Sequence, residues 1–160
     1  MGLFNKLKFD SKRETSKDDL IRTLKEAFKA ANLQYKIEDG IFSTGFMGDD
    51  LPIPMGILID DTVMCFRCPL ALKAEEINYQ KVVWELNAIN SKLTYGAFSL
   101  DPESGYIAFE YGFPYGEAKV SPGFLLAFIK MVIKTVDEND GKLKAIAEQV
   151  SKSEFEAMYG

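Results

Sequence analysis

The chain has 160 residues, 47% of them hydrophobic and 27% charged, which is typical of one folded domain with its own core. Its net charge of −5 argues against a nucleic-acid partner, because affinity for phosphate backbones comes largely from Lys and Arg. The absence of histidine excludes catalytic triads that need this residue and removes the commonest metal ligand. No apolar run reaches the roughly 18 residues that a membrane-spanning helix needs, so we expect a soluble, cytoplasmic protein.

Residues 1–15 differ from the rest of the chain, and we expect residues 16–160 to form a single domain. Within residues 1–9, apolar and basic side chains are interleaved: Leu3, Phe4, Lys6, Leu7, Lys8 and Phe9. Such a segment can form a short amphipathic helix at a membrane surface, or it can dock on the domain or fray. Its shortness favours the second interpretation, so membrane contact is expected only through residues 1–9, if at all.

The first helix is expected to begin after Ser16, which can form a capping box with Asp19, and to end near Asn32. Its apolar residues recur along one stripe: Leu20, Ile21, Leu24, Ala27, Phe28 and Ala31. Further on, the helical period disappears and β-forming residues are interrupted by Gly and Pro. Three strands are predicted there: 41–47, 55–59 and 62–68, the last two joined by a tight turn at Asp60 and Asp61.

The two cysteines, Cys65 and Cys68, have the spacing of a C-x-x-C motif but lie in the third predicted strand. Residues three apart on a strand point to opposite faces, so the two thiols cannot readily share a metal or form a disulfide. We therefore interpret them as buried, reduced thiols.

Helical spacing returns over residues 74–92, which we predict to be the second helix. Two strands follow, 95–100 and 106–113, separated by a turn at 101–105 that has Pro and Gly in favourable places. Their short connection predicts a second antiparallel hairpin.

The third helix is expected to begin at Pro122, after the capping residue Ser121. Its broad apolar stripe makes it the most hydrophobic helix and places it in the core. The polar stretch 137–141 is expected to break or kink it. A last helix is then indicated by four apolar residues: Leu143, Ile146, Ala147 and Val150.

The order helix, three strands, helix, two strands, helix predicts a two-layer α+β fold. The connections between neighbouring strands are too short for parallel crossovers, which need a dozen or more residues. We therefore expect one five-stranded antiparallel sheet with the helices packed on it.

Pairs of acidic residues are the only candidates for catalysis: Asp49 with Asp50, Asp60 with Asp61, and Asp101 with Glu103. Each pair falls in a predicted loop, where Asp is favoured because its side chain stabilises turns. Adjacent residues also project apart, so these carboxylates are not expected to converge on a substrate. We expect no catalytic residue, no cofactor and no metal site.

Three aromatic residues are the candidates for contact with a partner: Trp84, Phe113 and Tyr115. Phe109, Tyr111, Phe113 and Tyr115 share one face of a strand, so they are expected to pack beneath the helices unless the end of the strand extends past them. In that case Phe113 and Tyr115 would present aromatic surface. Trp84 lies off the apolar line of the second helix, either at the core margin or at an interface.

Residues 75–136 resemble the YbjN-like family of small bacterial proteins, within the type III secretion chaperone-like fold. The likeness rests on three segments: residues 84–90 (Trp-Glu-Leu-Asn-Ala-Ile-Asn), residues 96–110 with their central turn, and the helix capped by Ser121. The resemblance implies a non-enzymatic protein of the sensory-transduction regulator type, in a fold that secretion chaperones use to dimerise and to hold client segments. It supplies no catalytic residue.

We therefore expect a protein-binding module, chaperone-like or regulatory, that binds a protein partner or client and forms a homodimer. One alternative is an acidic immunity or inhibitor protein that binds a basic enzyme. Another is an enzyme of unrecognised type that uses the loop carboxylates.

Overall fold

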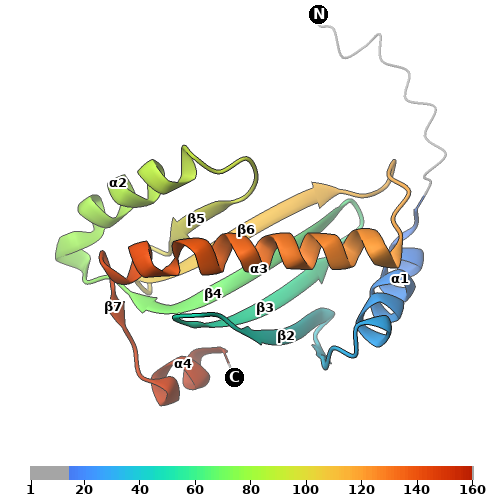
Figure 1. The fold of residues 1–160 in the computed structure, drawn as a ribbon, viewed down its shortest axis with the longest axis horizontal. Coiled ribbons are helices and arrows are strands. Elements are labelled where there is room, and N and C mark those ends of the chain that lie inside the picture. Colours follow the sequence, from blue (N-terminus) through green and yellow to red (C-terminus); the bar gives the residue numbers. More distant parts are fainter. Residues whose placement is uncertain (1–14, 160) are drawn as a thin grey trace, which may run out of the picture.

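The computed structural model describes residues 15–159, which form a single antiparallel sheet with a long helix lying along one face (Figure 1). The predicted segment 1–15 therefore lies outside the described residues, except for Thr15. In chain order the elements are α1 (Lys17–Ala30), β1 (Lys36–Glu38), β2 (Ile41–Met47), β3 (Pro52–Ile59), β4 (Val63–Lys73), the 3-10 helix η2 (Glu76–Asn78), α2 (Tyr79–Asn90), β5 (Ala97–Leu100), β6 (Tyr106–Pro114), α3 (Pro122–Lys144), β7 (Glu148–Gln149) and α4 (Lys152–Tyr159).

Two helices begin where the sequence predicts, because a serine caps each of them. The Ser16 side chain accepts a hydrogen bond from the Asp19 backbone, and the Asp19 carboxylate accepts from the Ser16 backbone in return. At α3 the Ser121 hydroxyl accepts from the Phe124 backbone, and Pro122 occupies the first turn. These bonds satisfy backbone donors that the helix itself leaves unpaired.

The sheet is antiparallel throughout, as predicted, but it has seven strands and not five. Its order is β1-β2-β3-β4-β6-β5, and β7 pairs with the end of β4. The prediction missed β1 and β7, which have three and two residues and are exposed along their whole length. Strands this short and exposed show no alternation of apolar and polar residues, because hydrogen bonds to a neighbouring strand, and not burial of one face, hold them in place.

The expected break in the third helix is also wrong: α3 runs without interruption from Pro122 to Lys144. The polar side chains in residues 137–141 bond to neighbours instead of ending the helix. The Asn139 amide donates to the Thr135 carbonyl at 2.8 Å, and the Asp137 carboxylate accepts from the Asp49 backbone at 2.7 Å. The last helix accordingly begins later, at Lys152.

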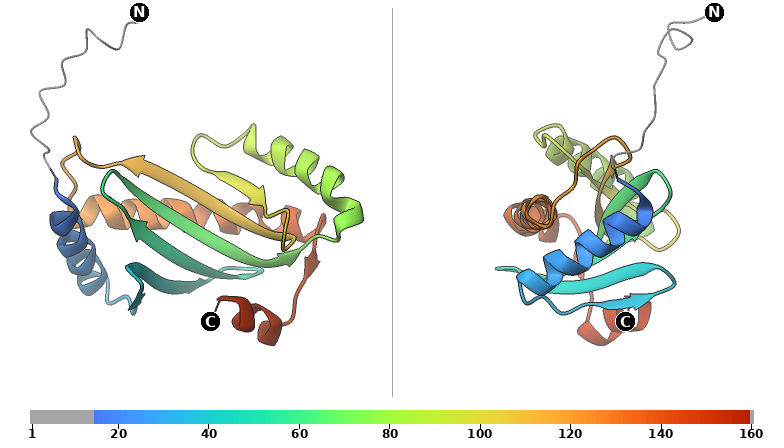
Figure 2. Two further views of the ribbon diagram at one scale, coloured as in Figure 1. Left: turned by 180° about the vertical axis from the view of Figure 1, so that it is seen from behind. Right: turned by 90° about the vertical axis from the view of Figure 1, so that its right-hand side faces the viewer.

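The two faces of the sheet differ in the helices that pack on them. Alternate residues of β2, β3, β4, β5 and β6 point toward the helix layer and form the core with α1, α2 and α3. Figure 2 shows the opposite face, where α4 is the only helix of residues 15–159 and lies at one end of the sheet. There Phe155 packs on Ala71 and Tyr106.

The two cysteines lie on opposite faces of β4, as predicted, and both are free thiols. Cys68 is fully buried beneath the helices, and burial raises its pKa to about 12. Cys65 is only half-buried and points to the opposite face, so the expectation of two buried thiols holds for Cys68 alone.

Candidate functional site: the open face of the sheet

The open face consists of the side chains of β2, β3, β4 and β6 that point away from α3. Strand pairing sets them in rows across the sheet. Ile41 pairs with Leu58, Leu58 with Cys65, and Cys65 with Gly112. The next row contains Ser43, Gly56, Arg67 and Glu110 in the same strand order.

A groove of about 830 Å³ runs over these rows. The apolar or weakly polar residues that line it include Ile41, Pro54, Met55, Leu58, Cys65 and Pro69. Leu58 is 46% exposed and Ile41 is 40% exposed, so a hydrophobic pair lies side by side in solvent. The volume lies within the range of sites that bind ligands.

Gly56 gives the groove its depth. A Cβ at this position would come no closer than 3.6 Å to the Ile41 side chain and 3.8 Å to the Arg67 carbonyl oxygen, which is ordinary contact. A larger side chain would therefore occupy the groove without a clash against the sheet.

Polar groups border the groove on one side. Arg67 and Glu110 form an ion pair across β4 and β6 with 3.1 Å between nitrogen and oxygen, and both side chains are about half exposed. Because such exposed pairs are weak, their groups remain available to hydrogen-bond a bound segment.

The thiol in the groove is not activated for chemistry. Burial raises the pKa of Cys65, and the neighbouring Glu110 carboxylate raises it further. The protonated thiol is a poor nucleophile at neutral pH. The groove thus offers apolar contact with a polar border and is suited to binding.

Phe113 and Tyr115, two of the predicted partner-binding residues, are buried in the core. Phe113 is 9% exposed, and its ring centroid lies 4.9 Å from that of Phe128 in α3. Tyr115 is fully buried, and its hydroxyl donates to the Asp60 carbonyl at 2.6 Å. Phe113 and Tyr115 therefore pack beneath the helices, as the alternation predicts, and the alternative in which the end of β6 presents them as aromatic surface does not hold.

Trp84, the third predicted residue, is 73% exposed. It lies in α2 near two other exposed apolar side chains, Ile77 at 87% and Val83 at 52%. Ile77 belongs to the 3-10 helix η2 directly before α2, and Val83 and Trp84 are adjacent residues of α2. We call these three residues the α2 patch.

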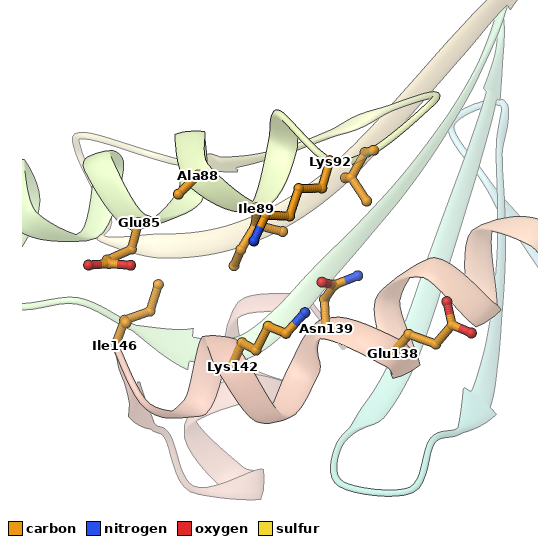
Figure 3. A pocket seen from close by; sticks show the side chains of 9 residues that line it. Glu85, Ala88, Ile89, Lys92, Glu138, Asn139, Lys142 and Ile146 are labelled. Carbon is orange, nitrogen blue, oxygen red and sulfur yellow. The ribbon is translucent and has the colours of Figure 1, made fainter.

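A second hollow, of about 420 Å³, lies between α2 and α3. Figure 3 shows Lys92 and Lys142 pointing into the space between the two helices, with Asn139 beside Lys142 and Glu85 farther along, opposite Ile146. The lining also includes Glu138, so the charges of two Lys and two Glu side chains balance. This cleft has no charge preference that would select a ligand.

The acidic loop residues stabilise turns. The Asp60 carboxylate accepts hydrogen bonds from the backbones of Thr62 and Val63, which lower its pKa. The Asp101 carboxylate accepts from the Ser104 hydroxyl and the Glu103 backbone, with the same effect on its pKa. Across residues 15–159, no three or more Cys, Asp or Glu side chains are grouped in a way that could hold a metal ion.

The groove is not among the features predicted from the sequence, although β3 carries a signal for it. Ile57, Leu58 and Ile59 are consecutive apolar residues in β3, where a strand with one solvated face would alternate apolar and polar side chains. Ile57 and Ile59 are buried in the core, so Leu58 is the residue that breaks the pattern.

No helix in the described part of the chain is long and apolar enough to cross a membrane. No curated protein matches the sequence. Among solved structures, the fold is similar to the YbjN protein of E. coli, titled "a putative transcription regulator", with a TM-score of 0.57 and 11% identity over 76% of this chain and 92% of that chain.

Two further structures share the fold. One is the HopA1-SchA chaperone-effector complex, with a TM-score of 0.50 and 14% identity over 72% of this chain and 88% of that chain. The other is an uncharacterized protein from Methanothermobacter thermautotrophicus, with a TM-score of 0.50 and 12% identity over 81% of this chain and 97% of that chain.

The resemblance inferred from the sequence is confirmed by a family model that matches residues 21–144, from the second turn of α1 to the end of α3. The family is described as "Putative bacterial sensory transduction regulator". Since this match spans well over half of the chain, the protein belongs to the YbjN family.

Proposed function

We propose that this protein is a non-enzymatic binding module that holds an extended segment of a partner protein in the groove on the open face of its sheet. The observation that carries the proposal is an apolar groove on a sheet face that no helix in the described part of the chain covers along most of its length. Contiguous exposed apolar surface bordered by polar groups is typical of protein interaction sites.

The dimensions favour an extended segment. Alternate side chains of an extended chain are about 6.6 Å apart, the same repeat as the rows of the open face, so they can enter successive rows. Covering the exposed parts of Leu58 and Ile41 would contribute about 1 kcal/mol each. Arg67 and Glu110 can hydrogen-bond the backbone of the segment at the border.

The comparisons support this choice of function without identifying a partner. One structure with this fold is a chaperone in complex with an effector protein, so the fold is compatible with holding another chain. The family description as a regulator fits a protein that acts through its partners.

The test is a selection of displayed peptides against the full chain, followed by calorimetry on those that bind. We expect peptides with apolar residues at alternate positions. Their affinity should fall about tenfold or more with Leu58→Glu, because a charge would be buried against apolar groups. Gly56→Val should weaken them by filling the groove, and Met47→Glu, at an exposed apolar residue of β2 that does not line the groove, is the matched control. Equal affinity for all four proteins would reject the groove.

We assign homodimerisation to the α2 patch, because Ile77, Val83 and Trp84 would leave solvent together in a two-fold contact. The two free thiols suit a reducing compartment, which is the basis for proposing a cytoplasmic location.

A second candidate function is that of an acidic inhibitor of a basic protein, and the chain's net charge of −5 favours it. Binding of that kind would depend strongly on salt. Binding in the groove would persist at high salt, because apolar contact is not screened.

A further inference from the structure

The groove begins close to the point where the described chain begins. The Thr15 hydroxyl donates to the Ala118 carbonyl at 2.6 Å, just beyond the end of β6. The Lys17 Nζ atom lies 3.5 Å from the Asp61 Oδ1 atom, in the turn between β3 and β4. Leu58 stands only a few residues before that turn, so residue 14 is joined to the body at the same end of the sheet as the Leu58 end of the groove.

Residues 1–14 are long enough to reach across the groove. Fully extended, 14 residues span about 46 Å at roughly 3.3 Å per residue. From the turn to Pro54, at the other end of the groove, β3 covers about 20 Å. Several residues are thus left over for passing around the end of the sheet.

The composition of this segment matches the groove. On an extended chain, Leu3, Leu7 and Phe9 would share one side, and Lys6 and Lys8 the other. One side could thus contact the apolar groove while the lysines stay in water. Residues 1–14 carry four basic and two acidic side chains, so their overall charge is opposite to that of the rest of the chain, which carries 15 basic and 22 acidic ones. The charged residues that line the groove itself are Lys36, Arg67 and Glu110, so the match to the groove rests on the apolar side chains.

The fold already uses one end of the chain in this way. At the opposite end of the sheet, α4 places Phe155 on the open face against Ala71 and Tyr106. Covalent attachment gives a segment an effective concentration on the order of mM, so even a weak contact with the groove would be occupied.

We propose that residues 3–9 occupy the groove of their own chain, with Leu7 and Phe9 on the apolar rows, and that a protein partner must displace them. This inference rests on the proposed function, since it assigns the regulation of the same groove.

Cys65 provides the test, because its thiol lines the groove while that of Cys68 is fully buried. The full chain is treated with a thiol reagent and digested with trypsin. Cleavage after Arg67 separates the two cysteines, so mass spectrometry reads each labelling rate by itself. Cys68 serves as the internal control for unfolding.

We expect the double variant Leu7→Glu/Phe9→Glu to increase the labelling rate of Cys65 about tenfold. This factor is the ratio of the effective concentration of the tethered segment, on the order of 1 mM, to a dissociation constant of about 0.1 mM for its contact with the groove. The matched control is Phe4→Glu, on the other side of the extended segment, which should leave the rate unchanged. The proposal is overturned if Cys65 reacts equally fast in the wild-type chain and the double variant, or if Phe4→Glu acts like the double variant.

The rate must also be independent of protein concentration. Protection of Cys65 that grows with concentration would place a second copy in the groove and overturn docking within one chain.

Peptide binding separates this proposal from the proposed function. If selected peptides bind but Cys65 is unprotected, the proposed function is supported and the proposal that residues 3–9 occupy the groove is rejected. If Cys65 is protected but no peptide binds either the wild-type chain or the double variant, the segment docks and the proposed function fails. Tighter peptide binding by the double variant supports both.

Discussion

Replacing two adjacent residues of β3 by alanine should destabilise the protein to very different degrees. Ile57 is fully buried and pairs with Phe42 and Phe66 inside the core. Ile57→Ala therefore removes buried methyl groups and leaves a cavity, which costs about 3 kcal/mol. Leu58 is 46% exposed on the open face, so Leu58→Ala loses about 1 kcal/mol of apolar burial and leaves no closed cavity.

For a chain of this size, 1 kcal/mol corresponds to a shift of about 2–4 °C in Tm. Ile57→Ala should therefore lower Tm by about 6–12 °C, and Leu58→Ala by about 2–4 °C. Far-UV circular dichroism is the suitable assay, because Trp84 is 73% exposed and its fluorescence would respond weakly to unfolding.

Equal losses of Tm for the two variants would refute the reasoning, since Leu58 would then be as buried in solution as Ile57. Measuring both variants in the Leu7→Glu/Phe9→Glu background separates any contribution of residues 1–14 to the cover of Leu58.

Three further outcomes are expected. Trp84→Ala should shift the protein from dimer to monomer in sedimentation velocity; an unchanged sedimentation coefficient would remove the α2 patch from the dimer contact. Tyr115→Phe should lower the free energy of unfolding in urea by about 1 kcal/mol, because the Asp60 carbonyl loses its donor, while peptide affinity stays constant. Asp140 is buried, and its Oδ2 atom has no hydrogen-bond partner among residues 15–159; its pKa is raised by burial and by two neighbouring carboxylates. Its neutral form therefore supports folding below the ordinary pKa of 3.8, and this stability is lost as pH rises through the raised pKa. Asp140→Asn should stabilise the protein at neutral pH and much less in acid, and equal effects at both pH values would contradict this.

Local chemistry made most of the fold predictable. The caps at Ser16 and Ser121 depend only on residues within one turn, so the two helix starts could be predicted from the sequence. The antiparallel pairing followed from short connections. The uninterrupted α3 could not be foreseen, because the group that bonds Asp137 is the Asp49 backbone, 88 residues away in the chain.

The position of Phe113 depends on a comparison of lengths that no single segment contains. The alternation in β6 shows that its aromatic residues share a face, but not how far a helix covers that face. With 23 residues, α3 is about 34 Å long, whereas the nine residues of β6 span about 30 Å. The helix therefore covers the strand to its end, and Phe113 becomes part of the core.

The open face is better explained by binding than by folding. An antiparallel sheet can leave one face in water, but that face is then normally polar. In this protein Ile57 and Ile59 are buried in the core. Leu58 and Ile41 are exposed neighbours that line the groove, and the lack of a side chain at Gly56 makes the groove deeper. A polar residue at Leu58 would satisfy the fold equally well, since that side chain contributes little to the core. A single exposed leucine requires no explanation, but an exposed apolar pair lining a hollow of about 830 Å³ is accounted for by a segment that covers it.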